Sequence, residues 1–129
     1  DFGTATSFDV VAADGAYLGG AIAPGLQASH DALVRRTSRL RRVDLIEPAR
    51  AIGRSTEEAM QSGMFYGYAG LITGLVSRLR EEAPDVELVV ATGGLARPMA
   101  ALCTVIDTVE VDLTLHGLWV IWCRHERMK

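Results

Sequence analysis

Cysteine is scarce in this chain. Cys103 and Cys123 are the only thiols, they do not form a paired-cysteine motif, and no secretory leader pattern accompanies them. Such usage is typical of proteins in a reducing compartment. We therefore expect a cytoplasmic protein in which both cysteines are small, buried hydrophobic residues.

Long apolar runs and an excess of basic charge are also missing. Charge or glycine interrupts the apolar stretches every few residues, and none reaches the roughly 18 to 20 residues of a membrane span. The 13 basic and 16 acidic residues leave a net charge of −3, the wrong sign for binding nucleic acid or an anionic membrane. We expect neither of these as a partner.

The sequence lacks the motifs of zinc sites and of several enzyme classes. Its three histidines, His30, His116 and His125, have no second ligand at metal-binding spacing. There is no nucleophile elbow, no Walker-type loop and no Gly-x-Gly-x-x-Gly run after a strand. We therefore do not expect a zinc site.

The first third of the chain predicts a hairpin and a helix. Its 129 residues, 49% of them hydrophobic, fit one compact domain. Residues 4–11 and 16–22 are rich in strand formers and flank a turn at Asp14-Gly15, which indicates a β-hairpin. Residues 26–40 have helical spacing with a basic C-terminal end, and residues 43–46 are a candidate short strand.

A long helix follows. Ser55 and Glu58 have the spacing of a capping box, and the helix is expected to run to Glu82. Four glycines inside it fall on one face at spacings of four, three and four residues: Gly63, Gly67, Gly70 and Gly74. We expect this face to pack closely against neighbouring elements, with a dimer interface as one possibility.

The last third alternates short elements. Residues 87–91 predict a buried strand, residues 95–102 a helix and residues 105–111 an extended connection. Residues 113–126 predict a terminal amphipathic helix, which carries both tryptophans of the chain. We expect these tryptophans in the core or in an interface.

Two segments have the composition of phosphate or nucleotide loops. In Asp1-Phe2-Gly3-Thr4, glycine permits close approach of backbone N–H groups to phosphate, a hydroxyl adds a donor, and a carboxylate can hold a cation. Thr92-Gly93-Gly94 follows a predicted strand, where α/β folds often bind ligands. From the residues alone, an ordinary strand entry and an ordinary turn remain alternatives.

Two further candidates are weaker. Thr56 lies in the first turn of the long helix, where free N–H groups favour a polar or anionic ligand, although simple capping also explains it. The run from Leu18 to Gly25 contains three glycines and a proline, a composition more typical of a tight bend.

Together and in this order, these motifs resemble the C-terminal half of the bacterial type III pantothenate kinases over nearly the whole chain. The matching segments are 1–11 (DFGTATSFDVV), 17–25 (YLGGAIAPG), 53–74 (GRSTEEAMQSGMFYGYAGLITG), 91–96 (ATGGLA) and 113–118 (LTLHGL). That family belongs to the actin-like ATPase superfamily, in which two ribonuclease H-like domains face an ATP cleft. The resemblance implies an α/β fold with a mixed sheet flanked by helices, and it makes the whole chain the C-terminal ribonuclease H-like domain.

The resemblance also implies a reaction and a set of roles. The family uses ATP to phosphorylate pantothenate to 4'-phosphopantothenate, the first step of coenzyme A biosynthesis, as homodimers that require magnesium and potassium or ammonium. If the roles of the matching family motifs apply here, the resemblance implies that Asp1 would hold the monovalent cation, Thr4 would contact ATP phosphate and Thr56 would hydrogen-bond pantothenate. Gly93 and Gly94 would face the nucleotide.

The chain departs from the family pattern in two respects. Ser55-Thr56 stands where the family usually has Asn-Thr, a mild change because serine also caps helices. The family's Asp-x-Gly-Asn motif, and the Gly-x-Asp-Arg motif with its proposed general base, do not occur in these 129 residues. A general base contributes about 10² to 10⁴ in rate, so we assign no catalytic residue and predict that this chain alone is nearly or wholly inactive.

Three hypotheses remain open at this stage. The chain could be part of a pantothenate kinase whose missing N-terminal half is a separate partner chain, a lost segment or an omitted part of the protein. It could also be a non-catalytic ligand-binding or dimerisation module of the same fold. A sugar or acetate kinase of the superfamily is the third, against which the Gly-Arg-Ser-Thr run argues. The sequence opens on Asp1 without a methionine, so we expect an N-terminus cut by a domain boundary, by processing or by expression of a fragment.

Overall fold

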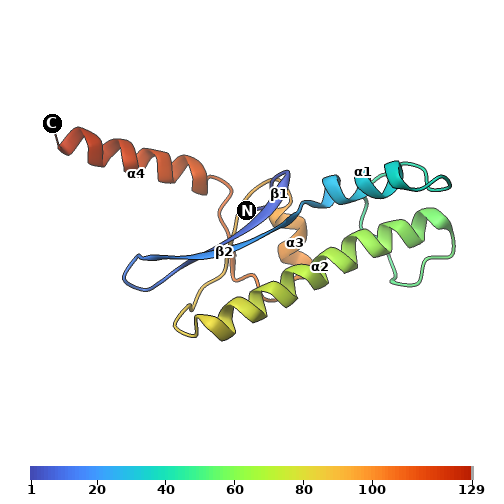
Figure 1. Cartoon of the computed structure of the whole chain (residues 1–129), viewed down its shortest axis with the longest axis horizontal. Helices are drawn as coiled ribbons and strands as arrows, with labels where there is room; N and C mark the ends of the chain where they lie inside the picture. Colours follow the sequence, from blue (N-terminus) through green and yellow to red (C-terminus); the bar gives the residue numbers. More distant parts are fainter. Residues whose placement is uncertain (129) are drawn as a thin grey trace.

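The computed structural model describes residues 1–128, which form a mixed α/β structure of helices and small sheets (Figure 1). In chain order the elements are β1 (Ala5–Val11), β2 (Tyr17–Pro24), α1 (Leu26–Arg36), α2 (Thr56–Glu82), β3 (Val90–Ala91), α3 (Ala96–Leu102), β4 (Thr108–Val109) and α4 (Leu113–Arg127). In Figure 1 the β1–β2 hairpin runs alongside the C-terminal part of α2, and α4 extends away from the other elements.

Both antiparallel and parallel pairing occur in the sheets. β1 and β2 form the predicted hairpin, antiparallel from the Ala5–Pro24 pair to the Val11–Tyr17 pair. β3 and β4 pair in parallel. An isolated parallel bridge between Phe2 and Gly93 links the two sheets. The hairpin and the α/β class are therefore confirmed, and the strands form two two-stranded sheets, one antiparallel and one parallel.

The core forms where α2 meets the strands and α3. One face of α2 buries Phe65, Tyr68, Ile72 and Val76, at the three- to four-residue spacing of a packed helix face. They join one cluster with buried residues from the rest of the chain: Phe2, Leu26, Ala91, Ala96, Met99 and Cys103. This cluster fixes the N-terminal segment and the β3–α3 turn on the same side of α2.

The start of α2 confirms the predicted capping box, with one change of partner. The Ser55 hydroxyl accepts from the Glu58 amide at 3.1 Å. The Glu58 carboxylate accepts from the amide of Arg54, the residue before the cap, at 2.7 Å. These bonds satisfy two of the N–H groups around a helix start that otherwise lack a backbone acceptor.

The glycine face of α2, formed by the four residues named above, does not pack within the chain. All four glycines are exposed, and a methyl group built on any of them meets no atom within 4 Å. The prediction that this face packs closely against other elements is therefore wrong for contacts within the described residues. The core-facing side of α2 is the opposite one, so the glycines point outward.

Two predictions for the 26–53 region were also wrong. The helix ends at Arg36, four residues early, because Thr37 turns extended and its hydroxyl donates to the Leu33 carbonyl at 2.9 Å. Residues 43–46 form no strand. The Val43 amide donates instead to the imidazole Nε2 of buried His30 at 3.3 Å, in place of a neighbouring strand.

The strand predicted at residues 87–91 is shorter, since only Val90–Ala91 pairs with β4. At Val89 the carboxylate of Asp107 accepts the amide hydrogen at 2.7 Å, in place of a backbone acceptor, while the Val89 carbonyl still accepts from the Thr108 amide at 3.3 Å. The helix α3 is confirmed to within one residue, and its Pro98 lies in the first turn, where proline is tolerated.

The terminal helix α4 forms as predicted, but its tryptophans are not in a core. Trp119 and Trp122 remain 58% and 61% exposed. Cys103 is buried as expected, whereas Cys123 on α4 is only half-buried. Across residues 1–128, no helix combines the length and apolar character needed to cross a membrane.

Candidate functional site

The structure joins the two predicted loops into one junction. The Phe2 amide donates to the Thr92 carbonyl at 2.8 Å, and the Gly94 amide donates back to the Phe2 carbonyl at 3.2 Å. The sequence presented Asp1–Thr4 and Thr92–Gly94 as separate candidates. In the fold they are neighbours, which places an exposed carboxylate, an exposed threonine and a glycine turn together.

Gly93 makes this close approach possible. Its backbone has φ +91°, a conformation that other residues rarely adopt. A Cβ at this position would lie 2.6 Å from Asp1 Oδ1 and 2.6 Å from the Phe2 carbonyl oxygen. A side chain would therefore push the Asp1 carboxylate and the N-terminal segment away from the turn.

The start of α1 closes the other side of the junction. The Gly25 amide donates to the Thr4 carbonyl at 3.1 Å, and a Cβ on Gly25 would lie 2.3 Å from that oxygen. Gly25 is the N-cap of α1, so the helix begins beside Thr4. Free N–H groups and the helix dipole give this end a preference for negative charge.

Buried contacts beneath the junction hold it on α2. The hydroxyl groups of Thr6 and Tyr68 share a hydrogen bond that is shielded from solvent. The Phe2 and Tyr68 rings pack at a centroid distance of 6.3 Å and an interplanar angle of 60°. These two contacts attach the segment that carries the exposed Asp1 and Thr4 to α2.

The polar groups of the junction fit an anionic ligand with a cation. The Thr4 side chain is exposed, and among residues 1–128 the Asp1 carboxylate forms no ion pair. A carboxylate without a cationic partner is a suitable ligand for a monovalent cation, which in turn lowers the cost of bringing phosphate close.

Thr56 lies in a different place. It is the first residue of α2, and that end of the helix is well separated from the N-terminus of the chain (Figure 1). Its side chain is exposed, while capping is performed by Ser55. The structure therefore groups Asp1, Thr4, Gly93 and Gly94 but leaves Thr56 outside that group.

A small cavity that the sequence did not reveal lies beside the start of α2. It has a volume of about 250 Å³ and is lined by Glu47, Pro48, Ala49, Arg50, Glu58 and Gln61. The Gln61 amide donates to the Asp44 carbonyl at 2.9 Å and the Tyr66 hydroxyl to the Pro48 carbonyl at 2.8 Å, which pins this segment to α2. Irregular backbone carries no periodic pattern, so sequence reasoning had no signal for it.

Comparison with known proteins gives the family. The sequence profile of the type III pantothenate kinases matches residues 1–78. The chain belongs to this family. Type III pantothenate kinases of Syntrophotalea carbinolica and Thermus thermophilus are 50% and 53% identical to it, over 98% and 92% of its length. That of Paramagnetospirillum magneticum is 54% identical over 97%.

The chain spans about half the length of these pantothenate kinases. The alignments cover 49%, 46% and 48% of the three relatives. A Baf family protein from Campylobacter jejuni is similar in structure, with a TM-score of 0.67 over 96% of this chain and 55% of that protein. At 20% sequence identity, this likeness shows a shared fold only.

Proposed function

We propose that this chain supplies one half of a pantothenate kinase site, which transfers phosphate from ATP to pantothenate and yields 4'-phosphopantothenate for coenzyme A biosynthesis. The observation that carries the proposal is the junction of Asp1–Thr4 with Thr92–Gly94 in a member of this family. It explains why two loops some 90 residues apart both have a phosphate-loop composition. The whole chain would then be one ribonuclease H-like domain of the actin-like superfamily.

The roles follow from the chemistry of the groups. The Thr4 hydroxyl and the adjacent start of α1 would donate to ATP phosphate, and the Gly93-Gly94 turn would face the nucleotide. The Asp1 carboxylate would hold potassium or ammonium. Such a cation supplies positive charge beside the phosphates.

Thr56 would hydrogen-bond pantothenate at the N-terminal end of α2. Because Thr56 lies apart from the junction within one chain, the transfer needs a further part of the protein to bring pantothenate to the phosphate. The described residues hold no group of three or more potential metal ligands. Magnesium supplied with ATP would neutralise charge on its phosphates.

A reconstitution assay tests the proposal. The 129-residue chain is mixed with the first half of the Thermus thermophilus relative, the part that the alignment leaves uncovered, and ADP release is followed with ATP, magnesium, potassium and pantothenate. We expect turnover from the mixture and none from either half. Asp1→Asn should lower turnover and raise the potassium needed, and Thr56→Ala should raise the KM for pantothenate.

The outcomes separate the hypotheses. Kinase turnover by the isolated chain would contradict the assignment of the general base to the other half. ATP or pantothenate binding without turnover in the mixture would favour a ligand-binding module. A matched control, Thr104→Ala, removes an exposed threonine hydroxyl two residues after α3 and should leave the kinetics unchanged.

A further inference from the structure

An irregular segment joins α1 to α2. Residues 37–55 form neither helix nor strand, and they lead directly into Thr56, the first residue of α2. Residues 47–50 also line the cavity beside the start of α2. The path of this segment therefore shapes the cavity and the surroundings of Thr56. We call residues 37–55 the α1–α2 connection.

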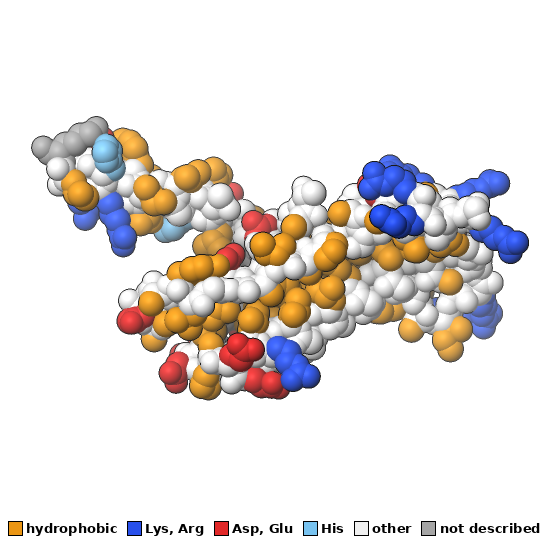
Figure 2. Space-filling view, viewed as in Figure 1, with side chains coloured by type: hydrophobic (Ala, Val, Ile, Leu, Met, Phe, Trp, Pro, Cys, Tyr) orange, Lys and Arg blue, Asp and Glu red, His pale blue; other side chains and the backbone are white. Residues whose placement is uncertain are grey.

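The α1–α2 connection carries an excess of positive charge. Its charged side chains are Arg39, Arg41, Arg42, Arg50 and Arg54, with Asp44 and Glu47 as the acidic residues. Figure 2 shows a group of arginine side chains at the end of the molecule where α1 and the connection lie. Like charges repel, and ordering a segment without periodic hydrogen bonds costs conformational entropy. Specific contacts must therefore hold the connection in place.

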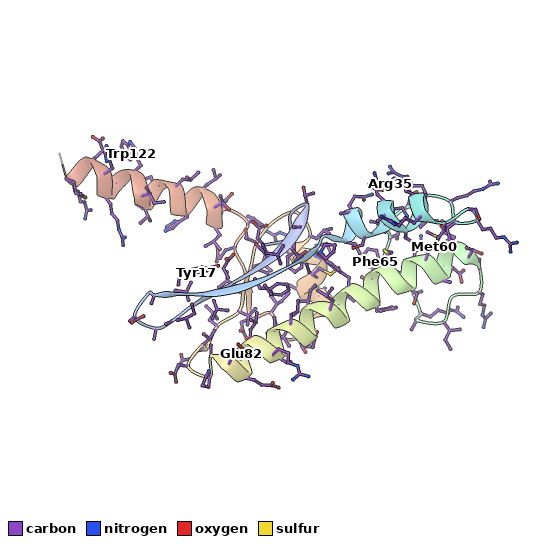
Figure 3. The ribbon with its side chains drawn as sticks, in the orientation of Figure 1. Tyr17, Arg35, Met60, Phe65, Glu82 and Trp122 are labelled. Atoms are coloured by element: carbon purple, nitrogen blue, oxygen red, sulfur yellow. The ribbon has the colours of Figure 1, made fainter. Side chains whose placement is uncertain are left out.

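A buried histidine on α1 provides one of these contacts. α1 lies beside the first half of α2 (Figure 3, in which Arg35 of α1 and Met60 and Phe65 of α2 are labelled). His30 on α1 is 0% exposed, and its Nε2 accepts from the Val43 amide of the connection at 3.3 Å. A ring nitrogen that accepts carries no proton, so this bond requires the neutral ring with its hydrogen on Nδ1.

The other ring nitrogen of His30 is unsatisfied. Among the described residues Nδ1 has no hydrogen-bond partner, and Asp31 Oδ1 lies 3.7 Å away, beyond hydrogen-bonding distance. An apolar side chain would fill the same space without leaving a buried N–H group unpaired. The bond to Val43 is thus the contact that a histidine supplies here and an apolar residue could not.

The neighbouring residue, Asp31, makes a second contact with the connection. Arg42 donates to Asp31 Oδ1 at 2.6 Å, so two adjacent residues of α1 hold two adjacent residues of the connection. The Arg42 side chain is 69% exposed, and an exposed ion pair adds little stability. The bond from Val43 to the buried ring of His30 is therefore the more important of the two.

The later part of the connection is held by α2. Gln61 and Tyr66 donate to two of its carbonyl groups, as described above. The Ser62 hydroxyl donates to the Ala51 carbonyl at 2.5 Å. These contacts all come from α2, whereas His30 joins the connection to α1.

α1 contacts both parts of the candidate site. Its N-cap, Gly25, is bonded to Thr4 of the junction, and His30 lies little more than one turn further along the same helix. Thr56 and the junction lie apart within the chain. Through His30, α1 therefore links the candidate phosphate site to the segment that leads into Thr56.

We propose that His30 is a positioning residue for pantothenate. Through Val43 it sets the path of the α1–α2 connection, and with it the cavity and the surroundings of Thr56. His30 itself is buried and would touch no substrate. The inference rests on the proposed function for the identity of the ligand, whereas the contact between His30 and Val43 does not depend on it.

Three substitutions of His30 separate this role from packing. In His30→Gln the side-chain amide oxygen can reach the position of Nε2 and accept from Val43. In His30→Asn the side chain is one carbon shorter and does not reach that position, and His30→Leu offers no acceptor. The glutamine variant is therefore the rescue, and the asparagine variant is its matched control.

The first measurement uses the ¹⁵N-labelled 129-residue chain. A long-range ¹H–¹⁵N spectrum should show His30 as the tautomer with hydrogen on Nδ1, and hydrogen exchange should find the Val43 amide protected. We expect His30→Gln to keep this protection and the other two variants to lose it by about tenfold or more, because an amide without an acceptor exchanges readily.

The second measurement is the steady-state kinetics of the chain mixed with the first half of the Thermus thermophilus relative. We expect His30→Asn and His30→Leu to raise the KM for pantothenate about tenfold and to leave the KM for ATP nearly unchanged, because the displaced segment lies beside Thr56. His30→Gln should restore the KM. Where a His30 variant does not fold, Val43→Pro removes the donor, keeps the ring and should give the same rise.

The outcomes decide each step separately. Equal exchange of the Val43 amide in all variants would show that His30 does not hold the connection. Lost protection with an unchanged pantothenate KM, or equal rises in both KM values, would show that His30 does not position the substrate.

Absence of turnover from the unmodified mixture would count against the proposed function. Calorimetric titration of the mixture with pantothenate then decides the proposal. His30→Asn should bind pantothenate about tenfold more weakly than His30→Gln, and equal or undetectable binding by the two variants would overturn the positioning role.

Discussion

Thr6 on β1 and Tyr68 on α2 share a buried hydrogen bond across 62 residues of sequence. Thr6 is 1% exposed and Tyr68 is 6% exposed. The bond fixes the strand that follows Asp1–Thr4 onto the middle of the longest helix. It therefore links the packing of the core to the position of the candidate phosphate site.

The first prediction concerns this pair. Tyr68→Phe leaves the Thr6 hydroxyl buried without its partner, which should lower the free energy of unfolding by about 1–3 kcal/mol. Thr6→Val in the same protein removes the stranded hydroxyl, so the double variant should recover part of the loss. Urea unfolding followed by circular dichroism gives all three values. Strictly additive losses would show that the two hydroxyls do not interact.

The second prediction compares two adjacent glycines. Gly93→Ala places a Cβ 2.6 Å from the Phe2 carbonyl oxygen in a positive-φ conformation, and strain of this kind costs on the order of 1–3 kcal/mol. Gly94→Ala meets no atom within 4 Å and should change stability little. Thermal unfolding of both variants tests the difference. Equal melting temperatures would mean that the Asp1–Gly93 contact does not exist in solution.

The third prediction uses the two thiols. Burial raises the pKa of the Cys103 thiol, so at pH 8 a smaller fraction of it is thiolate than for an ordinary cysteine. Access is also blocked, since Cys103 is 1% exposed whereas Cys123 is half-buried. Iodoacetamide should alkylate Cys123 first, as measured by peptide mass spectrometry. In urea the two rates should converge, and a faster reaction at Cys103 in the folded protein would contradict the structure.

Local sequence signals predicted those elements whose contacts are local. The hairpin around Asp14-Gly15 and the capping box of Ser55 and Glu58 depend on residues a few positions apart, and both are present. The joining of Phe2 to Thr92 is a long-range contact. The periodicity of a sequence does not show which loops meet in the fold. Both loops could therefore be predicted as candidates, but the contact between them could not.

The predictions that were wrong concern segments whose hydrogen bonds differ from those of the predicted element. The helix predicted to Leu40 ends at Arg36 because Thr37 bonds back to Leu33, a local alternative to the helix ladder. The strand predicted at 43–46 has no neighbour to pair with, and its amide at Val43 bonds to His30. The tryptophans were expected in a core or an interface; Trp119 and Trp122 are exposed in the described part of the chain, so the core is excluded and the interface stays a prediction.

The fourth prediction concerns the glycine face of α2, for which we propose a homodimer interface. Helices approach most closely where side chains are absent, and four outward glycines on one face provide such a surface. Gly67→Leu adds a side chain in its middle and should shift sedimentation velocity toward monomer, with little loss of stability because the position is open within the chain. Gln27→Leu, which adds a leucine at an exposed position of α1, serves as the control and should leave the oligomeric state unchanged. If Gly67→Leu sediments like the unmodified chain, the glycine face is not the dimer contact.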